Sequence, residues 1–350
     1  MVRSPGVLHL VDTLDPGGTE RVAVNLVNHL SRQRFRPFLG NTRREGALAA
    51  EVLPDVGRLS LNRSRTLDLG ALRRLVAFVR ENEISIVHAH SSSLFLAVLL
   101  PGARIVWHDH FGRLAAEDRP AWLWGLPARR AAAVVAVSED LARWSRDRLR
   151  VEAVYLPNFV PEVPAGPVPD LPGAPGRRVV CVANLRAQKD HLTLLRAIAQ
   201  IPEAHLLLAG ADVEPAYAAR VREEASALGG RVTFLGSLSD IPDLLRGCDV
   251  GVLSSASEGF PLSLLEYGRA GIAAVATRVG QCPEVLDGAG ILVPPGDPGA
   301  LADALRALLG DPARRKELGE QLCRRVRERY SASAVMGRLE AVYHRVLGST

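Results

Sequence analysis

Residues 250–266 read VGVLSSASEGFPLSLLE, and this stretch contains the structural unit from which the fold class is inferred. Its first four residues form a short apolar run that is typical of a buried strand. A turn with a glycine and a proline follows, and the apolar spacing beyond it predicts a helix that begins near Leu262 or Ser263. A strand, a tight turn and a helix in direct succession are the repeating unit of a parallel sheet covered by helices.

This unit recurs along the whole chain, because short apolar runs alternate with longer amphipathic stretches. The strands expected in the first half are residues 7–11, 36–40, 84–88, 104–107, 134–137 and 153–156. Those expected in the second half are residues 178–182, 205–209, 232–235, 250–253, 273–276 and 291–293. Helices are expected between them, for example at 20–30, 69–81 and 139–149, and the chain end from 313 to 347 has a helical pattern. The predicted fold class is α/β, with two Rossmann-like domains whose parallel sheets face a central cleft.

A break in composition marks the boundary between the two domains. Six prolines and three glycines lie between Pro161 and Gly176, which is too many for a regular element. We therefore expect an N-terminal domain at 1–160, a linker at 161–176 and a C-terminal domain at 177–331.

Charge and hydropathy narrow the class of partner. Residues 1–160 hold 22 arginines against 16 acidic residues, whereas residues 161–350 hold 21 basic and 22 acidic residues. The basic first half favours an anionic partner such as a lipid head group at a membrane face, although solvated surface arginines explain the excess equally well. Aromatic residues are scarce, which disfavours nucleic acid. The apolar runs are too short for a membrane span or a signal peptide, so the predicted location is cytoplasmic, with at most peripheral contact with the inner membrane face.

The residues after the strand at 250–253 are suited to a diphosphate. A helix that begins there leaves the amides of Leu262 and Ser263 without intrahelical acceptors, and the helix dipole adds to their attraction for an anion. Glu258 precedes the turn and Glu266 lies within the helix, so their carboxylates can flank this seat and bind vicinal hydroxyls. The alternative is structural, because Ser263 and Glu266 also have the spacing of a capping box.

Two further loops follow expected strands and can contact the same ligand. Arg186 and Lys189 come after the strand at 178–182, and together they can neutralise a departing diphosphate, although a solvated loop is the alternative. Gly17 and Gly18 follow the first strand and let the backbone approach a ligand, and Thr19 is placed to cap the next helix.

Four of the nine histidines lie in two groups at expected strand ends, His88 with His90 and His108 with His110. We interpret them as contacts to a sugar or an acceptor, with core histidines as the alternative. Neither group has the usual zinc-ligand spacing, the sequence has no Asp-x-Asp motif, and its four cysteines are far apart. We therefore expect no metal and no other cofactor.

Together these strings resemble the retaining GT-B glycosyltransferases of family 4. The resemblance is carried by Glu258 and Glu266 with seven residues between them, and by the string NLRAQKD at 184–190. The early Gly-Gly pair, VHAH at 87–90, VS at 137–138 and LPN at 156–158 stand in the same order as in the family. The resemblance implies a GT-B fold over essentially the whole chain, with the segment from about 332 to 350 crossing back onto the first domain.

The resemblance also implies roles for individual residues. The implied catalytic residues are His108, Glu258, Arg186 and Lys189. The implied donor-binding residues are Gly17, Gly18, Arg186, Lys189, Ser237, Leu238, Glu258, Gly259, Phe260, Pro261, Leu262, Ser263 and Glu266. The implied acceptor contacts are His88, His90 and His110, and His110 is the alternative to His108 as the active-site histidine.

Within this set, Glu266 would hold the donor ribose and Glu258 the transferred sugar, whereas backbone between Gly236 and Ser239 would contact the base. Pro261 stands where glycine is commoner in the family and removes one amide.

The implied reaction transfers a hexose-type sugar, with retention, from a nucleotide-diphosphate donor to a hydroxyl of a glycan, lipid-linked or small-molecule acceptor. No protein nucleophile is needed, because a diphosphate oxygen takes the proton of the acceptor. A nucleotide-sugar 2-epimerase, a phosphorylase and a non-catalytic sugar-nucleotide-binding subunit are the alternatives on the same scaffold.

Overall fold

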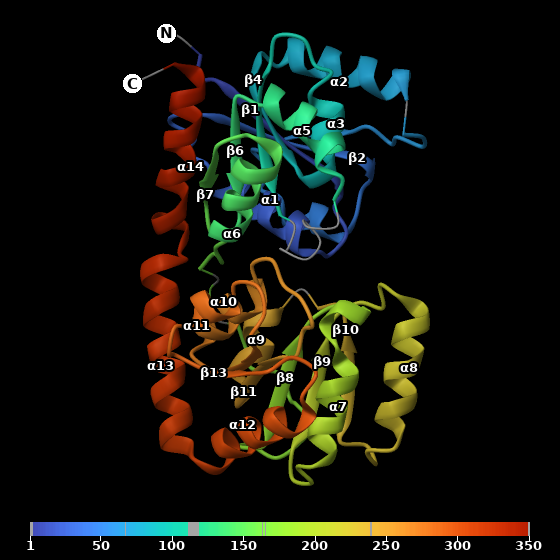
Figure 1. Cartoon of the computed structure of the whole chain (residues 1–350), viewed down its shortest axis with the longest axis vertical. Helices are drawn as coiled ribbons and strands as arrows, with labels where there is room; N and C mark the ends of the chain where they lie inside the picture. The colour runs from blue at the N-terminus through green and yellow to red at the C-terminus, as the bar shows by residue number, and fades with distance from the viewer. Residues whose placement is uncertain are drawn as a thin grey trace. The chain divides into compact units, whose positions relative to one another are not determined.

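The computed structural model describes residues 3–66, 68–110, 119–162, 164, 166–238 and 240–348. The chain forms two compact units, one of residues 1–159 with 332–350 and one of residues 160–331 (Figure 1). The helical chain end consists of two helices, α13 (Pro312–Arg329) in the second unit and α14 (Ala332–Leu347) in the first.

The first unit is built on a seven-stranded sheet in the order β3-β2-β1-β4-β5-β6-β7, and its strand pairs are parallel. Its strands are β1 (Gly6–Thr13), β2 (Arg36–Arg44), β3 (Gly57–Ser60), β4 (Ile84–His90), β5 (Arg104–Asp109), β6 (Ala133–Ala136) and β7 (Ala153–Tyr155). Strand β3 was not predicted from the sequence, because this edge strand has a single large apolar residue, Leu59, and alternates between partly exposed and exposed positions.

The main helices of this unit are α1 (Gly18–His29), α2 (Leu69–Glu81), α3 (Leu94–Ala97), α5 (Ala121–Arg130) and α6 (Glu139–Trp144), and a π-helical turn, η3 (Ser145–Leu149), follows α6. Asp68 caps α2 and Ser138 caps α6 through their side chains. The predicted cap at Thr19 is wrong. The N-cap of α1 is Gly17, which has no side chain to cap with, and Thr19 already lies inside the helix.

The second unit has a six-stranded parallel sheet in the order β10-β9-β8-β11-β12-β13. Its strands are β8 (Arg178–Val182), β9 (His205–Ala209), β10 (Val232–Gly236), β11 (Val250–Leu253), β12 (Ala273–Thr277) and β13 (Ile291–Val293). Its helices, besides α13, are α7 (His191–Ala199), α8 (Pro215–Ser226), α9 (Ile241–Arg246), α10 (Leu262–Ala270), α11 (Cys282–Leu286) and α12 (Pro298–Gly310).

Helices cover both faces of this second sheet (Figure 1). One face packs its alternating apolar side chains against α7, α8 and α12. On the other face the Tyr267 hydroxyl, from α10, accepts from the Val182 amide at 2.9 Å and donates to the Val252 carbonyl at 3.0 Å. A Cβ on Gly251 would lie 2.5 Å from the Tyr267 ring, so this glycine lets α10 approach the sheet. Tyr267 thereby fixes α10 over the adjacent strands β8 and β11.

Both sheets reverse their strand order at one point, between β1 and β4 in the first unit and between β8 and β11 in the second. In open α/β sheets of this kind, ligands bind outside the carboxyl ends of the strands at such a switch point. A ligand site is therefore expected at these two edges, each within its own unit.

Candidate active site

The loops that follow β8 and β11 are bonded to each other at the switch point of the second unit. The Gln188 side-chain amide donates to the Ser257 carbonyl at 2.8 Å, and the Ala256 amide donates to the Gln188 carbonyl at 2.9 Å. The Ser254 hydroxyl donates to the Lys189 carbonyl at 3.0 Å. Two sequence segments that lie about 70 residues apart thus form one surface.

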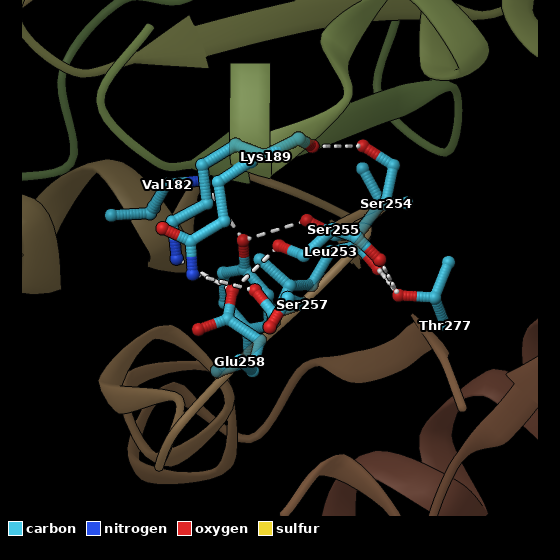
Figure 2. Close-up of polar contacts among 11 residues, drawn as sticks. Val182, Lys189, Leu253, Ser254, Ser255, Ser257, Glu258 and Thr277 are labelled. Carbon is cyan, nitrogen blue, oxygen red and sulfur yellow. Dashed lines mark hydrogen bonds and ion pairs between the residues drawn. The ribbon is translucent and has the colours of Figure 1, made fainter. Parts of the chain in front are cut away.

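Lys189 and Glu258 form an ion pair on this surface. The Lys189 ammonium lies 2.5 Å from Glu258 Oε1, which also accepts from the Ser255 hydroxyl (Figure 2). Glu258 is buried and Lys189 is partly buried. A buried carboxylate is costly unless it is paired and hydrogen-bonded, and these two contacts meet that need. The sequence placed Glu258 and Lys189 in one site but did not predict their direct contact.

The backbone around Glu258 is held by the segment after β12, which the sequence analysis did not include in the site. Gly280 has a φ of +49°, and a Cβ at this position would lie 2.1 Å from the Glu258 carbonyl oxygen. The Gln281 amide donates to the Gly259 carbonyl at 3.2 Å, and the Thr277 hydroxyl donates to the Ser255 carbonyl at 2.6 Å (Figure 2). The signal that was available is the position of Gly280 soon after a predicted strand.

Arg186 lies three residues before Lys189 in the same loop. Its Nε is buried and has no hydrogen-bond partner among the residues that the structure describes. The loop itself is fixed, because the Asn184 side-chain oxygen accepts from the Ala211 amide at 2.9 Å and the Glu214 carboxylate accepts from the Ala187 amide at 2.9 Å. A cation held at a strand end without a partner is suited to an anionic ligand.

The start of α10 lies directly after the Glu258 loop. Its N-cap is Pro261, which makes no side-chain cap, so the capping-box alternative for Ser263 and Glu266 is wrong. The amides of the first turn, including those of Leu262 and Ser263, are therefore not capped by a side chain of the box.

The other predicted donor contacts of this unit are placed as follows. Glu266 is partly exposed on the second turn of α10, and Gly259 is also partly exposed. Phe260 is buried against Tyr330, with ring centroids 5.5 Å apart, so only its backbone is suited to a ligand. Ser237 and Leu238 are exposed after β10, whereas Ser239 lies outside the described residues.

In the first unit, all four predicted histidines lie together at the switch point, and a fifth joins them. Strand pairing places His9 of β1 opposite His88 and His90 opposite His108, on the face of the sheet that α14 covers. Neighbouring rings have centroids 4.0 to 5.4 Å apart. The sequence analysis missed His9, although its place in the first strand was a usable signal.

Hydrogen bonds connect these rings to Tyr343 of α14, which the sequence analysis also missed. The Tyr343 hydroxyl lies 2.7 Å from His88 Nδ1 and 3.0 Å from His9 Nε2. His9 Nδ1 lies 3.0 Å from His90 Nε2, and His90 Nδ1 lies 2.8 Å from His110 Nε2. No sequence pattern links a tyrosine at 343 to the first strand.

Counting donors assigns a direction to this chain of hydrogen bonds. If His110 donated inward, His88 would be left with a protonated Nε2, which is buried and has no partner among the described residues. In the opposite direction, His88 Nδ1 donates to the Tyr343 oxygen and the Tyr343 hydroxyl donates to His9. His9 then donates to His90, and His90 donates to His110. His88 Nε2 is then unprotonated and has only an unused lone pair. An unpaired buried N–H costs more than an unused lone pair. The tautomers with Nδ1 protonated on His9, His88 and His90 are therefore favoured.

His108 differs from the other rings of the cluster. Both of its ring nitrogens are buried without a partner in the described part of the chain, so its one ring proton makes no hydrogen bond to the described residues. Burial holds the pKa of His108, His88 and His90 well below the ordinary value, helped by neighbouring histidines, and burial lowers the pKa of His9 and of His110 to about 3. At neutral pH the cluster is uncharged, so a ligand there would be bound by hydrogen bonds rather than by charge.

The cluster also contains two groups of three ring nitrogens that lie within 4.8 Å of one another, His9 with His88 and His90, and His90 with His108 and His110. Neutral imidazoles at such distances can hold a transition metal. In the same unit, Gly18 is exposed at the start of α1, and apart from its chain neighbours and the backbone of its own helix no atom of the described chain lies within 4 Å of where its Cβ would be. Gly17 precedes it as the N-cap, and a Cβ there would lie 2.3 Å from the Glu20 carboxylate, so the open backbone is that of Gly18.

A buried ion pair fixes the end of β5, which carries His108. The Arg119 guanidinium donates twice to the Asp109 carboxylate, at 3.2 and 2.7 Å. Its carbon lies 4.9 Å from the Trp124 ring and 4.4 Å from the Trp144 ring. Arg119 therefore connects β5 to α5 and α6.

Two family models match the chain, one in each unit. The family described as Glycosyltransferase Family 4 matches residues 16–162, and the family described as Glycosyl transferases group 1 matches residues 176–311. The chain belongs to glycosyltransferase family 4. The recognition made from the sequence motifs is therefore confirmed, and so is the assignment to an enzyme family of glycosyltransferases.

Curated relatives of this family 4 chain include the phosphatidyl-myo-inositol mannosyltransferase of Mycolicibacterium smegmatis, 32% identical over 61% of this chain and 58% of the relative. The N-acetyl-alpha-D-glucosaminyl L-malate synthase of Bacillus anthracis is 30% identical over 48% of this chain and 45% of the relative. The matched regions thus span 45 to 58% of the length of these relatives.

Solved structures confirm the GT-B fold. Sucrose-phosphate synthase from Thermosynechococcus elongatus matches with a TM-score of 0.84 and 20% identity, covering 99% of this chain and 100% of that chain. HepE from Anabaena, in complex with UDP and glucose, matches with a TM-score of 0.81 and 20% identity, covering 97% of this chain and 100% of that chain. Among the described residues, no helix is long and apolar enough to span a bilayer.

Proposed function

We propose that the chain is a retaining glycosyltransferase that moves a hexose-type sugar from a nucleotide-diphosphate donor to a hydroxyl of a glycan, lipid-linked or small-molecule acceptor. The main support for the proposal is that the Nε of Arg186 is buried without a partner among the described residues, in the loop that also holds Lys189, the ion-pair partner of Glu258. The oxygens of a diphosphate would satisfy this guanidinium. Family membership and the UDP complex of HepE support the same kind of donor.

In this proposal, the site residues of the second unit have separate roles. Arg186, Lys189 and the first amides of α10 hold the diphosphate and stabilise the negative charge that grows as the sugar leaves. Glu266 accepts from the ribose hydroxyls and Glu258 from those of the sugar. Because Glu258 already shares the Lys189 ammonium, both groups are positioned before the donor arrives.

In the first unit, His108 donates its unpaired ring proton to the donor sugar, and His88, His90 and His110 contact the acceptor. The acceptor hydroxyl attacks the anomeric carbon from the face on which the diphosphate leaves, and a diphosphate oxygen takes its proton. We further propose that turnover needs no metal, because two cationic side chains and a helix N-terminus supply the positive charge.

The test is release of nucleoside diphosphate from a panel of UDP-, GDP- and ADP-sugars, with EDTA present. Arg186→Met is expected to lower kcat/KM about a hundredfold with unchanged thermal unfolding, because one stabilising charge is lost from the transition state and the buried Nε has no hydrogen bond to lose among the described residues. Lys189→Ala is expected to lower it at least as much. Lys316→Ala, at the only other lysine, which is exposed on α13, is the matched control and is expected to keep full activity.

Other outcomes distinguish the alternatives. Conversion of the sugar nucleotide to an epimer without an acceptor indicates an epimerase, and dependence on inorganic phosphate indicates a phosphorylase. Thermal stabilisation by a donor without any turnover indicates a binding subunit. Full activity of Arg186→Met would show that the diphosphate binds elsewhere.

A further inference from the structure

Helix α5 of the first unit exposes three large apolar side chains. Trp122 is 80% exposed, Leu126 is 69% exposed and Leu123 is 42% exposed. Leu99, which is 51% exposed, follows α3, and α3 packs against α5 (Figure 1). Large apolar side chains gathered at one surface point to an interaction site, because scattered single ones are the norm on soluble surfaces.

The opposite side of α5 is anchored, so the exposed residues cannot turn inward. Trp124, Gly125 and Ala128 are buried, and the Trp124 ring stacks on Trp107 with centroids 5.7 Å apart. Trp122 and Leu126 are one turn apart, and Arg129 and Arg130 follow one turn later. The outer face of α5 is therefore an apolar stripe that ends in two arginines.

The surface beside this stripe is basic. Arg129 and Arg130 are exposed, and so are Arg148 and Arg150 at the end of η3. The two elements are in contact, because Arg129 Nε donates to the Leu149 carbonyl at 3.2 Å. Residues 121–150 contain six arginines against three acidic residues, and one of these acids, Asp140, is paired with Arg143.

We propose that α5 and η3 form a docking surface for an anionic lipid bilayer. Trp122 and Leu126 enter the boundary between head groups and acyl chains, and the four arginines lie at the level of the phosphates. Tryptophan and arginine both suit this position, because each combines an apolar body with a polar end. This surface favours a lipid-linked acceptor, and that part of the inference rests on the proposed glycosyltransferase function. Membrane binding itself does not depend on sugar transfer and can be tested without a sugar donor.

Flotation of the full chain with phosphatidylcholine vesicles, with and without phosphatidylglycerol, tests the surface. The chain is expected to float only with the anionic vesicles and to be released by salt. Leu126→Glu is expected to lower the partition coefficient at least about tenfold, since a leucine-sized apolar contact is lost. Arg129→Gln and Arg130→Gln are each expected to lower it about fivefold. The matched control is Leu69→Glu, because Leu69 is also 69% exposed but begins α2, and it is expected to bind like the wild type.

Vesicles with brominated acyl chains report whether Trp122 enters the bilayer, because bromine quenches the fluorescence of nearby tryptophans. They are expected to quench part of the tryptophan emission of the wild type, and Trp122→Phe is expected to remove that quenching. Absence of flotation with anionic vesicles overturns the proposal, as does an equal loss of binding in Leu69→Glu. Concentration-dependent dimers that Leu126→Glu disrupts would assign the surface to a second copy of the chain instead.

The same variants separate this inference from the proposed function. Thermal stabilisation by a sugar nucleotide, measured in solution without vesicles, depends on Arg186 in the second unit. If stabilisation and turnover are both absent while flotation persists, the proposed function fails and the docking surface stands. If the chain turns over a soluble acceptor but does not float with anionic vesicles, the docking surface is wrong and the proposed function stands.

Discussion

Single residues of the histidine cluster give the first unit a pH dependence with a definite sign. Burial lowers the pKa of His9 from 6.5 to about 3. Below pH 6.5, His9 binds a proton in the unfolded chain but not in the folded chain. Protonation therefore favours the unfolded state, and the free energy of unfolding decreases as the pH falls below 6.5.

We therefore expect the unfolding free energy of His9→Gln to fall less than that of the wild type between pH 7 and pH 5, by about 2 kcal/mol. Glutamine does not titrate, and any constant cost of the substitution cancels in this difference. Urea unfolding followed by tryptophan fluorescence measures it, because all four tryptophans (Trp107, Trp122, Trp124 and Trp144) lie in the first unit. Parallel pH curves for the two proteins would show that His9 titrates normally.

The same residues show how far a sequence leads to a site. The sequence allowed the grouping of six polar residues, because ligand sites of α/β proteins lie at the carboxyl ends of parallel strands. These residues are His88, His90, His108 and His110 in the first unit, and Lys189 and Glu258 in the second. Tyr343 and the Lys189–Glu258 contact were not predicted, since each joins segments that no periodicity relates. Arg186 was predicted as a site residue, but the sequence could not show that its Nε is buried and lacks a hydrogen-bond partner among the described residues.

At the scale of elements, strand and helix positions were well predicted where apolar periodicity was strong. The helices expected at 69–81 and 139–149 begin where predicted, each capped by the preceding residue, Asp68 or Ser138. β3 was missed because an edge strand with one large apolar side chain has no such pattern. Thr19 was misassigned, because the helix begins at an uncapped glycine that the spacing alone does not favour over a threonine.

The joint between β5, α5 and α6 depends on the buried Arg119–Asp109 pair. We expect Arg119→Met to destabilise the first unit by about 3 kcal/mol or more, because it removes a guanidinium and two hydrogen bonds from the buried Asp109 carboxylate. The double variant Arg119→Met with Asp109→Asn should be less destabilised than the sum of the two single changes, because the two side chains interact directly.

Urea unfolding by tryptophan fluorescence again gives the measurement. Arg143→Met, which removes the exposed pair with Asp140 on neighbouring α6, is the matched control and should change stability by no more than about 0.5 kcal/mol. Equal effects of Arg119→Met and Arg143→Met would mean that the buried pair does not hold the joint.

At the scale of the whole molecule, the second unit is contiguous in sequence, whereas the first is completed by the other end of the chain. Helix α14 buries Val335, Met336, Leu339, Val342 and Tyr343. Glu340 accepts from the Ser31 amide at 3.1 Å and pairs with Arg34 at 3.0 Å. The histidine cluster is thus closed by a helix that follows the entire second unit in the sequence.

Removal of residues 332–350 is therefore expected to unfold or loosen the first unit and to leave the second intact. Each large apolar side chain of α14 contributes about 1.5–3 kcal/mol on burial, so five together reach the whole net stability of a typical domain. Hydrogen exchange measured by mass spectrometry should show lost protection in β1, β4 and β5 and retained protection in β8, β11 and α10. Tyr343→Phe should cost only about 1–2 kcal/mol, because it removes the hydroxyl between His9 and His88 and keeps the ring. Uniform loss of protection in both units would contradict their independence, and an unchanged first unit would show that α14 is dispensable for its core.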